Sequence, residues 1–139
     1  MKVGLYPGSF KPFHKGHYNI LQKSEAIFDK VILGFGFNPE KDNINDYPPP
    51  KILSARDVRF YDGLLTDFIQ SLEYDDVTVI RGLRNSNDLH YELNKYRFLQ
   101  ELMPDIKVIS IFCDKEFEHI SSSAIRLLQR YGKAQQYLV

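Results

Sequence analysis

The 139-residue sequence has little of what several protein classes depend on. Its one cysteine, Cys113, excludes an internal disulfide and a multi-cysteine metal site. The 18 basic and 18 acidic residues cancel, so a general affinity for nucleic acid, which usually requires a basic excess, receives no support. No apolar run reaches the roughly 20 residues that span a bilayer, and no signal-peptide profile opens the chain. We therefore expect a protein of the reducing cytoplasm, with neither nucleic acid nor a membrane as a partner.

Two common phosphate-binding patterns are also missing. The chain lacks Gly-x-x-x-x-Gly-Lys-Ser/Thr, the loop of P-loop enzymes. It also lacks Gly-x-Gly-x-x-Gly after its first apolar run, so the dinucleotide-binding fingerprint is absent. A nucleotide site in this chain must therefore be built in another way.

Short apolar runs alternate with amphipathic runs along the whole chain. The pattern predicts strands at 3–6, 31–37, 58–61, 77–80 and 106–113, and helices at 16–28, 63–72, 85–102 and 122–131. Residues 38–50 are polar and rich in proline, which predicts a loop. This alternation predicts an α/β fold: a Rossmann-like, doubly wound, five-stranded parallel sheet with helices on both faces. Because no linker divides the chain, we expect residues 1–139 to form a single domain, with Cys113 buried in the last strand.

The most informative stretch is the turn between the first strand and the first helix, which reads GSFKPFHKGH at residues 8–17. A glycine turn that opens a helix favours anions, because free backbone N–H groups and the helix dipole both attract negative charge. His14 and His17 add hydrogen-bond donors at the same place. No third His, Cys or carboxylate follows nearby in the sequence, so we expect no protein-held metal.

Cations and hydroxyls follow the other predicted strands. Ligands of an open parallel sheet bind beyond the carboxyl ends of its strands. Lys41 follows the second strand, Arg81 and Arg84 follow the fourth, and the serines at 121–123 begin the last helix. Arginine offers a planar fork to phosphate, lysine a point charge, and a helix-capping serine its hydroxyl and nearby N–H groups. The set predicts a site for several phosphates.

Each of these cations also has a purely structural interpretation. Arg81 and Arg84 can form ordinary ion pairs with Asp88 and Glu92 at the entry to the next helix. Lys41 can be a solvated loop charge.

Several of these segments resemble one enzyme superfamily. HKGH at residues 14–17 resembles the Thr/His-x-Gly-His motif of the nucleotidyltransferases, and ISSS at residues 120–123 resembles their second motif. RGLR at residues 81–84, followed by Asp88, Tyr91 and Glu92, is similar to the phosphopantetheine adenylyltransferase family in particular. Lys41 falls where that family keeps a lysine for the substrate phosphate. The resemblance covers most of residues 1–126.

The resemblance implies a reaction and its participants. AMP is transferred from ATP to the phosphate of 4′-phosphopantetheine, giving dephospho-coenzyme A and pyrophosphate in coenzyme A biosynthesis. Mg²⁺ is implied as a cofactor that binds through the ATP phosphates rather than through protein ligands. Coenzyme A is the implied feedback ligand. A homo-oligomer is also implied, although the early end of the chain argues against the family's hexamer.

The resemblance also assigns a role to each matching residue. The implied catalytic residues are His17, which contacts the ATP α-phosphate, together with Lys41 and Arg84. The acceptor phosphate and its pantetheine arm are bound by Ser9, Lys41, Leu65 and Arg81. ATP is bound by Ser9, Phe10, His14, His17, Gly82, Leu83, Arg84, Glu92, Phe117, Ile120, Ser121, Ser122 and Ser123.

Two other functions remain open on the sequence. The first is a nicotinamide-mononucleotide adenylyltransferase, a family whose turn can read Pro-Phe-His-x-Gly-His. Two residues favour it: Lys11, which stands where the phosphopantetheine family usually has aspartate, and Arg126. The RGLR segment favours the phosphopantetheine enzyme. The other candidate is a non-catalytic nucleotide-binding module. The presence of His17, Lys41 and Arg84 argues against it.

Overall fold

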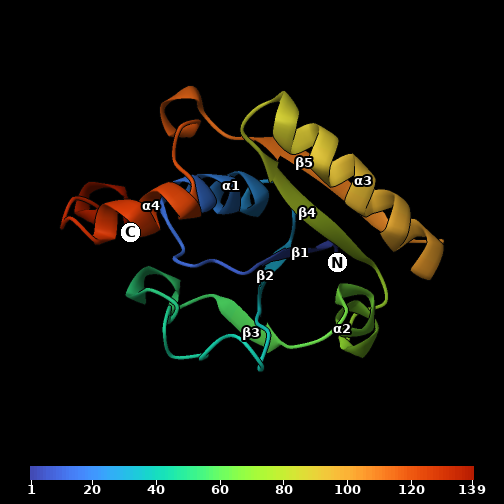
Figure 1. Ribbon diagram of the computed structural model, residues 1–139. Helices are drawn as coiled ribbons and strands as arrows, with labels where there is room; N and C mark the ends of the chain where they lie inside the picture. Colours follow the sequence, from blue (N-terminus) through green and yellow to red (C-terminus); the bar gives the residue numbers. More distant parts are fainter.

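The computed structural model describes residues 1–139 and contains one five-stranded sheet in the order β3-β2-β1-β4-β5 (Figure 1). The strands are β1 (Val3–Gly8), β2 (Lys30–Gly36), β3 (Asp57–Tyr61), β4 (Val77–Leu83) and β5 (Lys107–Phe112). Every neighbouring pair is parallel. The order places β1 at the centre, where the chain first turns from one half of the sheet to the other, and this is where such sheets bind ligands.

Helices cover both faces of the sheet, as predicted. Figure 1 shows α1 (Lys15–Glu25) and α4 (Ser122–Gln129) on one side and α2 (Leu65–Ser71) and α3 (Ser86–Leu102) on the other. Side chains alternate between the faces of a strand. Tyr6 accordingly packs with Ile20 of α1, whereas its neighbour Leu5 packs with Ile69 of α2. No helix is long and apolar enough to cross a bilayer.

A smaller apolar cluster joins α4 to the last residues of the chain. Ile120, Ile125 and Ala134 are buried together there, and Leu138 packs against them. Leu138 also forms an antiparallel bridge with His14. The cluster therefore holds the start of α4 beside the turn that follows β1.

The structure differs from the sequence prediction in two places that matter for the site. β4 does not end at Ile80 but continues through Leu83, because Arg81, Gly82 and Leu83 go on pairing with β5. Cys113 is not a buried strand residue: it follows β5, is partly exposed, and borders a cavity.

Candidate active site

The turn after β1 is held in shape by a buried aromatic ring. Phe10 has a φ of 48°, a left-handed conformation that costs a bulky residue about 1 to 3 kcal/mol. Its ring packs edge-on against Tyr6 and against His17, with centroids 5.2 Å and 4.8 Å apart. The core therefore supports a turn that carries the exposed Ser9 on one side and His17 on the other.

His14 and His17 cap the start of α1 reciprocally. His14 Nδ1 accepts hydrogen bonds from the backbone N–H groups of Gly16 at 3.1 Å and His17 at 3.4 Å. His17 Nδ1 accepts from the N–H of His14 at 3.1 Å, and the two rings stack with centroids 3.7 Å apart. Because each Nδ1 accepts, the proton of each neutral ring lies on Nε2. Each histidine is thus left with one N–H donor that the cap does not use.

Both histidines are neutral at physiological pH. Burial, with a smaller contribution from Arg84, lowers the pKa of His14 to about 4. Burial also lowers the pKa of His17 well below its ordinary value, helped by His14 and Arg84. Gly16 is required between them, since a Cβ there would lie 2.9 Å from His14 Cε1. The pair therefore offers hydrogen bonds to an anion without adding a positive charge.

The histidines open onto a cavity of about 490 Å³, here called the histidine cavity. It brings together every predicted ATP-binding residue except Phe10, which is buried behind the wall. The predicted residues that line it are Ser9, His14, His17, Gly82, Leu83, Arg84, Glu92, Phe117, Ile120, Ser121, Ser122 and Ser123.

The N-terminus of α4 borders the histidine cavity and is fastened to the first turn. Ser121 caps the helix by accepting from the N–H of Ala124 at 3.1 Å. Ser122 Oγ donates to the carbonyl of Pro12 at 3.4 Å, and Arg126 Nη1 donates to the carbonyl of Lys11 at 2.8 Å. A second helix dipole therefore adds to that of α1 at this cavity, and both favour an anion.

Arg81 and Arg84 are both ion-paired, which confirms the structural interpretation of these residues. Arg81 donates twice to the Glu92 carboxylate, at 2.8 Å each, and once to the carbonyl of Pro7 at 3.1 Å. Arg84 donates to Asp88 at 2.9 Å and 3.0 Å. A guanidinium has five N–H donors, so each arginine keeps donors for a phosphate. The ion pairs fix the orientation of the arginines and leave N–H donors free for the predicted binding of phosphate.

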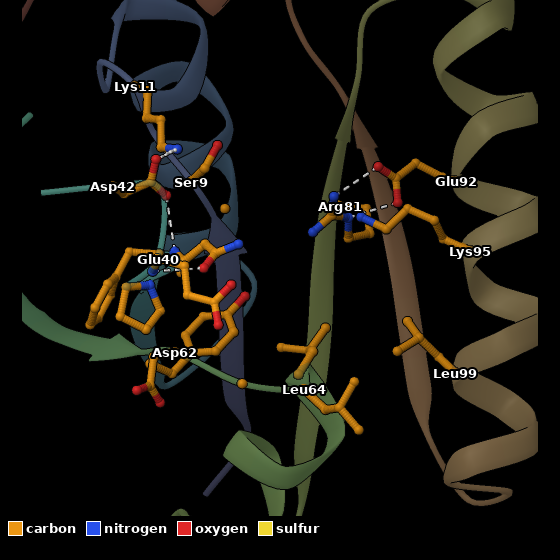
Figure 2. A pocket seen from close by; sticks show the side chains of 18 of the residues that line it. Ser9, Lys11, Glu40, Asp42, Asp62, Leu64, Arg81, Glu92, Lys95 and Leu99 are labelled. Atoms are coloured by element: carbon orange, nitrogen blue, oxygen red, sulfur yellow. Dashed lines mark hydrogen bonds and ion pairs between the residues drawn. The ribbon is translucent and has the colours of Figure 1, made fainter. Parts of the chain in front are cut away.

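A second cavity of about 960 Å³ lies beside the first, between the loop after β2 and helix α3 (Figure 2). We call it the loop cavity. Ser9, Tyr91 and Glu92 line both cavities, so the two meet at these residues. The predicted acceptor-binding residues Leu65 and Arg81 line the loop cavity with Ser9.

Lys41 is not brought to the other predicted residues. Its side chain is exposed and lines neither cavity, although its neighbours Glu40 and Asp42 line the loop cavity. Asp42 accepts from the backbone N–H of Asn38 at 2.9 Å and forms an ion pair with Lys11 Nζ at 2.6 Å. These contacts tie the loop to the first turn, and Lys41 is left outside both cavities.

Sequence reasoning missed many residues of the cavity walls, among them a thiol and two lysines. Cys113 lines the histidine cavity, and Lys11 and Lys95 line the loop cavity. Helical spacing provided a signal for Lys95, which lies three residues after Glu92 and so shares its face of α3. No sequence pattern indicated the ion pair between Lys11 and Asp42, because the two residues come together only when the chain folds.

Comparison with known proteins decides between the candidate families. The Cytidylyltransferase-like family profile matches residues 5–128. A phosphopantetheine adenylyltransferase from Clostridium tetani is 31% identical over 95% of this chain and 86% of its own length. One from Cytophaga hutchinsonii is 36% identical over 94% and 91%. The chain belongs to the phosphopantetheine adenylyltransferase family.

The fold of this family member is shared more widely. A solved structure from Vibrio parahaemolyticus, assigned as a nicotinate-nucleotide adenylyltransferase, superposes with a TM-score of 0.59 at 20% identity. The match covers 100% of this chain and 94% of that one. The chain is a nucleotidyltransferase by its family, and its Rossmann-like fold is also found outside that family.

Proposed function

We propose that the chain transfers AMP from ATP to 4′-phosphopantetheine. The observation that carries the proposal is the pair of adjoining cavities that share Ser9, Tyr91 and Glu92. ATP occupies the histidine cavity, and the acceptor occupies the loop cavity. The phosphate of the acceptor then meets the α-phosphate of ATP where the cavities join.

The reaction needs positioning more than proton transfer. A phosphate monoester is largely ionised near pH 7, since its second pKa is about 6. An oxygen of the acceptor phosphate attacks the α-phosphorus of ATP, a new P–O bond forms, and the bond to pyrophosphate breaks. No general base is required, so hydrogen-bond donors and cations can supply the catalysis.

The residues of the histidine cavity suit this chemistry. The free Nε2–H of His17 donates a hydrogen bond to the α-phosphate, and this hydrogen bond becomes stronger as negative charge builds in the transition state. Arg84 adds its remaining N–H donors, and the serines at 121–123 hold the other phosphates at the start of α4. Phe117 and Ile120 provide the apolar wall for the adenine. Phe10 contributes through its backbone, because its ring is buried.

We infer that Mg²⁺ enters as part of the ATP substrate. No three His, Cys, Asp or Glu side chains come together as a metal-binding group. The carboxylates at the histidine cavity, Asp88 and Glu92, are already bound to arginines. Oxygens of the triphosphate are then the ligands of the ion, which neutralises part of their charge.

The role of Lys41 stays a prediction that depends on loop movement. The ammonium reaches the acceptor only if residues 38–42 turn its side chain inward. Lys41→Ala then raises the KM for the acceptor more than the KM for ATP, and equal changes in both would place Lys41 elsewhere.

A nicotinamide-mononucleotide adenylyltransferase is the second candidate, because Arg126 lines the histidine cavity and is fixed by the carbonyl of Lys11. Pyrophosphate release from Mg-ATP, measured with each acceptor separately, decides between the two. We expect release with 4′-phosphopantetheine only. Release with the mononucleotide only would establish the second function. ATP binding without release with either acceptor would point to a different acceptor or to a binding module.

Regulation and assembly follow as further proposals. Coenzyme A carries the pantetheine arm, so it inhibits by competing with the acceptor for the loop cavity. Initial rates at several acceptor concentrations check this, since competitive inhibition disappears at saturating acceptor. We also propose that the chain assembles as a homo-oligomer, whose size sedimentation equilibrium measures directly.

A further inference from the structure

Lys95 is a half-buried cation without a carboxylate partner. It lines the loop cavity from α3 but forms no ion pair, whereas Lys11 is paired with Asp42 and Arg81 with Glu92. Its Nζ lies 5.4 Å from the ring centroid of Tyr91. Among the cations of this cavity, only Lys95 therefore lacks an anion of its own.

Immediately around Lys95, two cations, Lys95 itself and Arg81, face the single carboxylate of Glu92. Burial lowers its pKa, and the nearby Arg81 lowers it further, while Glu92 opposes both. Glu92 is already committed to two hydrogen bonds from Arg81. Of the other acidic residues of the wall, Asp42 is paired with Lys11, and Glu40 and Asp62 are exposed without an ion pair. Two cations thus share one carboxylate, an arrangement that a dianionic ligand would stabilise.

The direction of the side chain places this charge near the junction of the cavities. Side chains on a helix lean toward its N-terminus, so Lys95 reaches back over the turn that holds Tyr91 and Glu92. Figure 2 shows it extending from α3 toward Arg81 and Glu92. Glu92 lines both cavities, and the phosphate of the acceptor must come to this junction in order to react.

We propose that Lys95, together with Arg81, binds the phosphate of the acceptor, the position that sequence resemblance assigns to Lys41. The inference rests on the proposed function, because it requires an acceptor that carries a phosphate. Arg81 provides a fixed guanidinium, and Lys95 provides a mobile ammonium with three donors and no competing partner. Binding the phosphate raises the pKa of Lys95, because the dianion opposes the effects of burial and of Arg81.

Calorimetric titration with 4′-phosphopantetheine tests the assignment in four proteins: wild type, Lys95→Met, Lys95→Arg and Arg97→Met. Methionine keeps the unbranched side chain as far as Cε and removes the charged amine. A hydrogen bond to a charged group is lost, so Kd rises by about 10-fold or more in Lys95→Met. Lys95→Arg restores most of the affinity. Arg97, an exposed cation of the same helix outside the cavities, is the control, and its variant stays within about twofold of wild type.

Pantetheine without its phosphate serves as a second ligand. Its Kd stays the same in Lys95→Met if Lys95 contacts the phosphate, whereas an equal loss for both ligands overturns the proposal. An unchanged Kd for 4′-phosphopantetheine in Lys95→Met also overturns it. ATP affinity and the circular dichroism spectrum report whether the variants fold.

Pyrophosphate release measured on the same samples separates this inference from the proposed function. Binding without release by wild type refutes the transfer reaction but leaves the Lys95 comparison intact. Release with normal acceptor affinity in Lys95→Met refutes the Lys95 assignment alone. No binding of the acceptor by wild type refutes both.

Discussion

His17 combines two tasks in one side chain: Nδ1 accepts from the backbone of His14, and Nε2 is left for the substrate. Because its bond to the α-phosphate strengthens as charge develops, His17→Ala should lower kcat by about 10²-fold or more. The Kd for ATP should rise much less. Single-turnover pyrophosphate release and ATP titration measure the two effects, with the exposed His90→Ala as the control. Near-normal turnover in His17→Ala would remove His17 from the mechanism.

The depressed pKa of His14 makes the fold sensitive to mild acid. In the unfolded chain a histidine takes up its proton near pH 6.5, whereas folded His14 does so only at about 4. Its contribution is therefore complete above about pH 6.5 and falls as the pH is lowered toward 4. Between pH 7 and 5 the loss from His14 is about 2 kcal/mol.

His14→Asn isolates this contribution, since asparagine can also cap the helix by accepting from the same N–H groups. Urea unfolding at pH 7 and pH 5 should show a smaller drop in unfolding free energy for the variant than for wild type. Equal drops in the two proteins would show that His14 titrates normally in the fold.

At the scale of elements, Gly82 sets the distance between β4 and α1. A Cβ at this position would lie 2.8 Å from Ile20 Cγ1. Gly82→Ala should therefore lower the free energy of unfolding by about 1 to 3 kcal/mol, as overpacking does in cores. Gly63→Ala is the matched control, because no atom lies within 4 Å of the added methyl group. Urea denaturation of both variants makes the comparison, and a stable Gly82→Ala would mean that Ile20 moves freely.

Hydrophobic periodicity was enough to predict the strands and helices in order, but it misplaced the end of β4. The apolar run stops at Ile80, and neither Arg81 nor Gly82 looks like a buried strand residue. Pairing with Ser110 and Ile111 of β5 extends the strand nonetheless. Such pairing depends on which strand lies alongside, and local sequence does not contain that information.

The same dependence on the fold explains which parts of the site could be predicted from the sequence. Residues 8–17 and 120–123 are contiguous motifs, and the histidine cavity contains both as expected. The loop cavity is assembled from segments that lie far apart in the sequence, at residues 8–11, 36–42, 61–65, 81 and 91–99. The place of Lys41 in the sequence matches that of a family lysine. The ion pair between its neighbour Asp42 and Lys11 forms only in the folded chain, so it could not be predicted from the sequence. A site of dispersed residues is visible only when the chain is folded.

For the molecule as a whole, two apolar clusters both stabilise the fold, but only one of them lies at the histidine cavity. Ile69 belongs to the cluster under α2 and α3, whereas Ile125 belongs to the cluster that holds α4 beside the first turn. Both side chains are buried, with 8% and 1% of their surfaces exposed. Truncating either to alanine should lower the free energy of unfolding by about 2 to 5 kcal/mol.

Only Ile125→Ala should also weaken ATP binding, because the start of α4 carries the serines that line the histidine cavity. Urea denaturation and ATP calorimetry on both variants measure the two quantities independently. An ATP Kd raised several-fold in Ile125→Ala, with Ile69→Ala near wild type, would show that the small cluster positions the nucleotide site. Equal ATP affinities in the two variants would instead mean that the capping contacts of Ser121 and Ser122 hold α4 in place without the cluster.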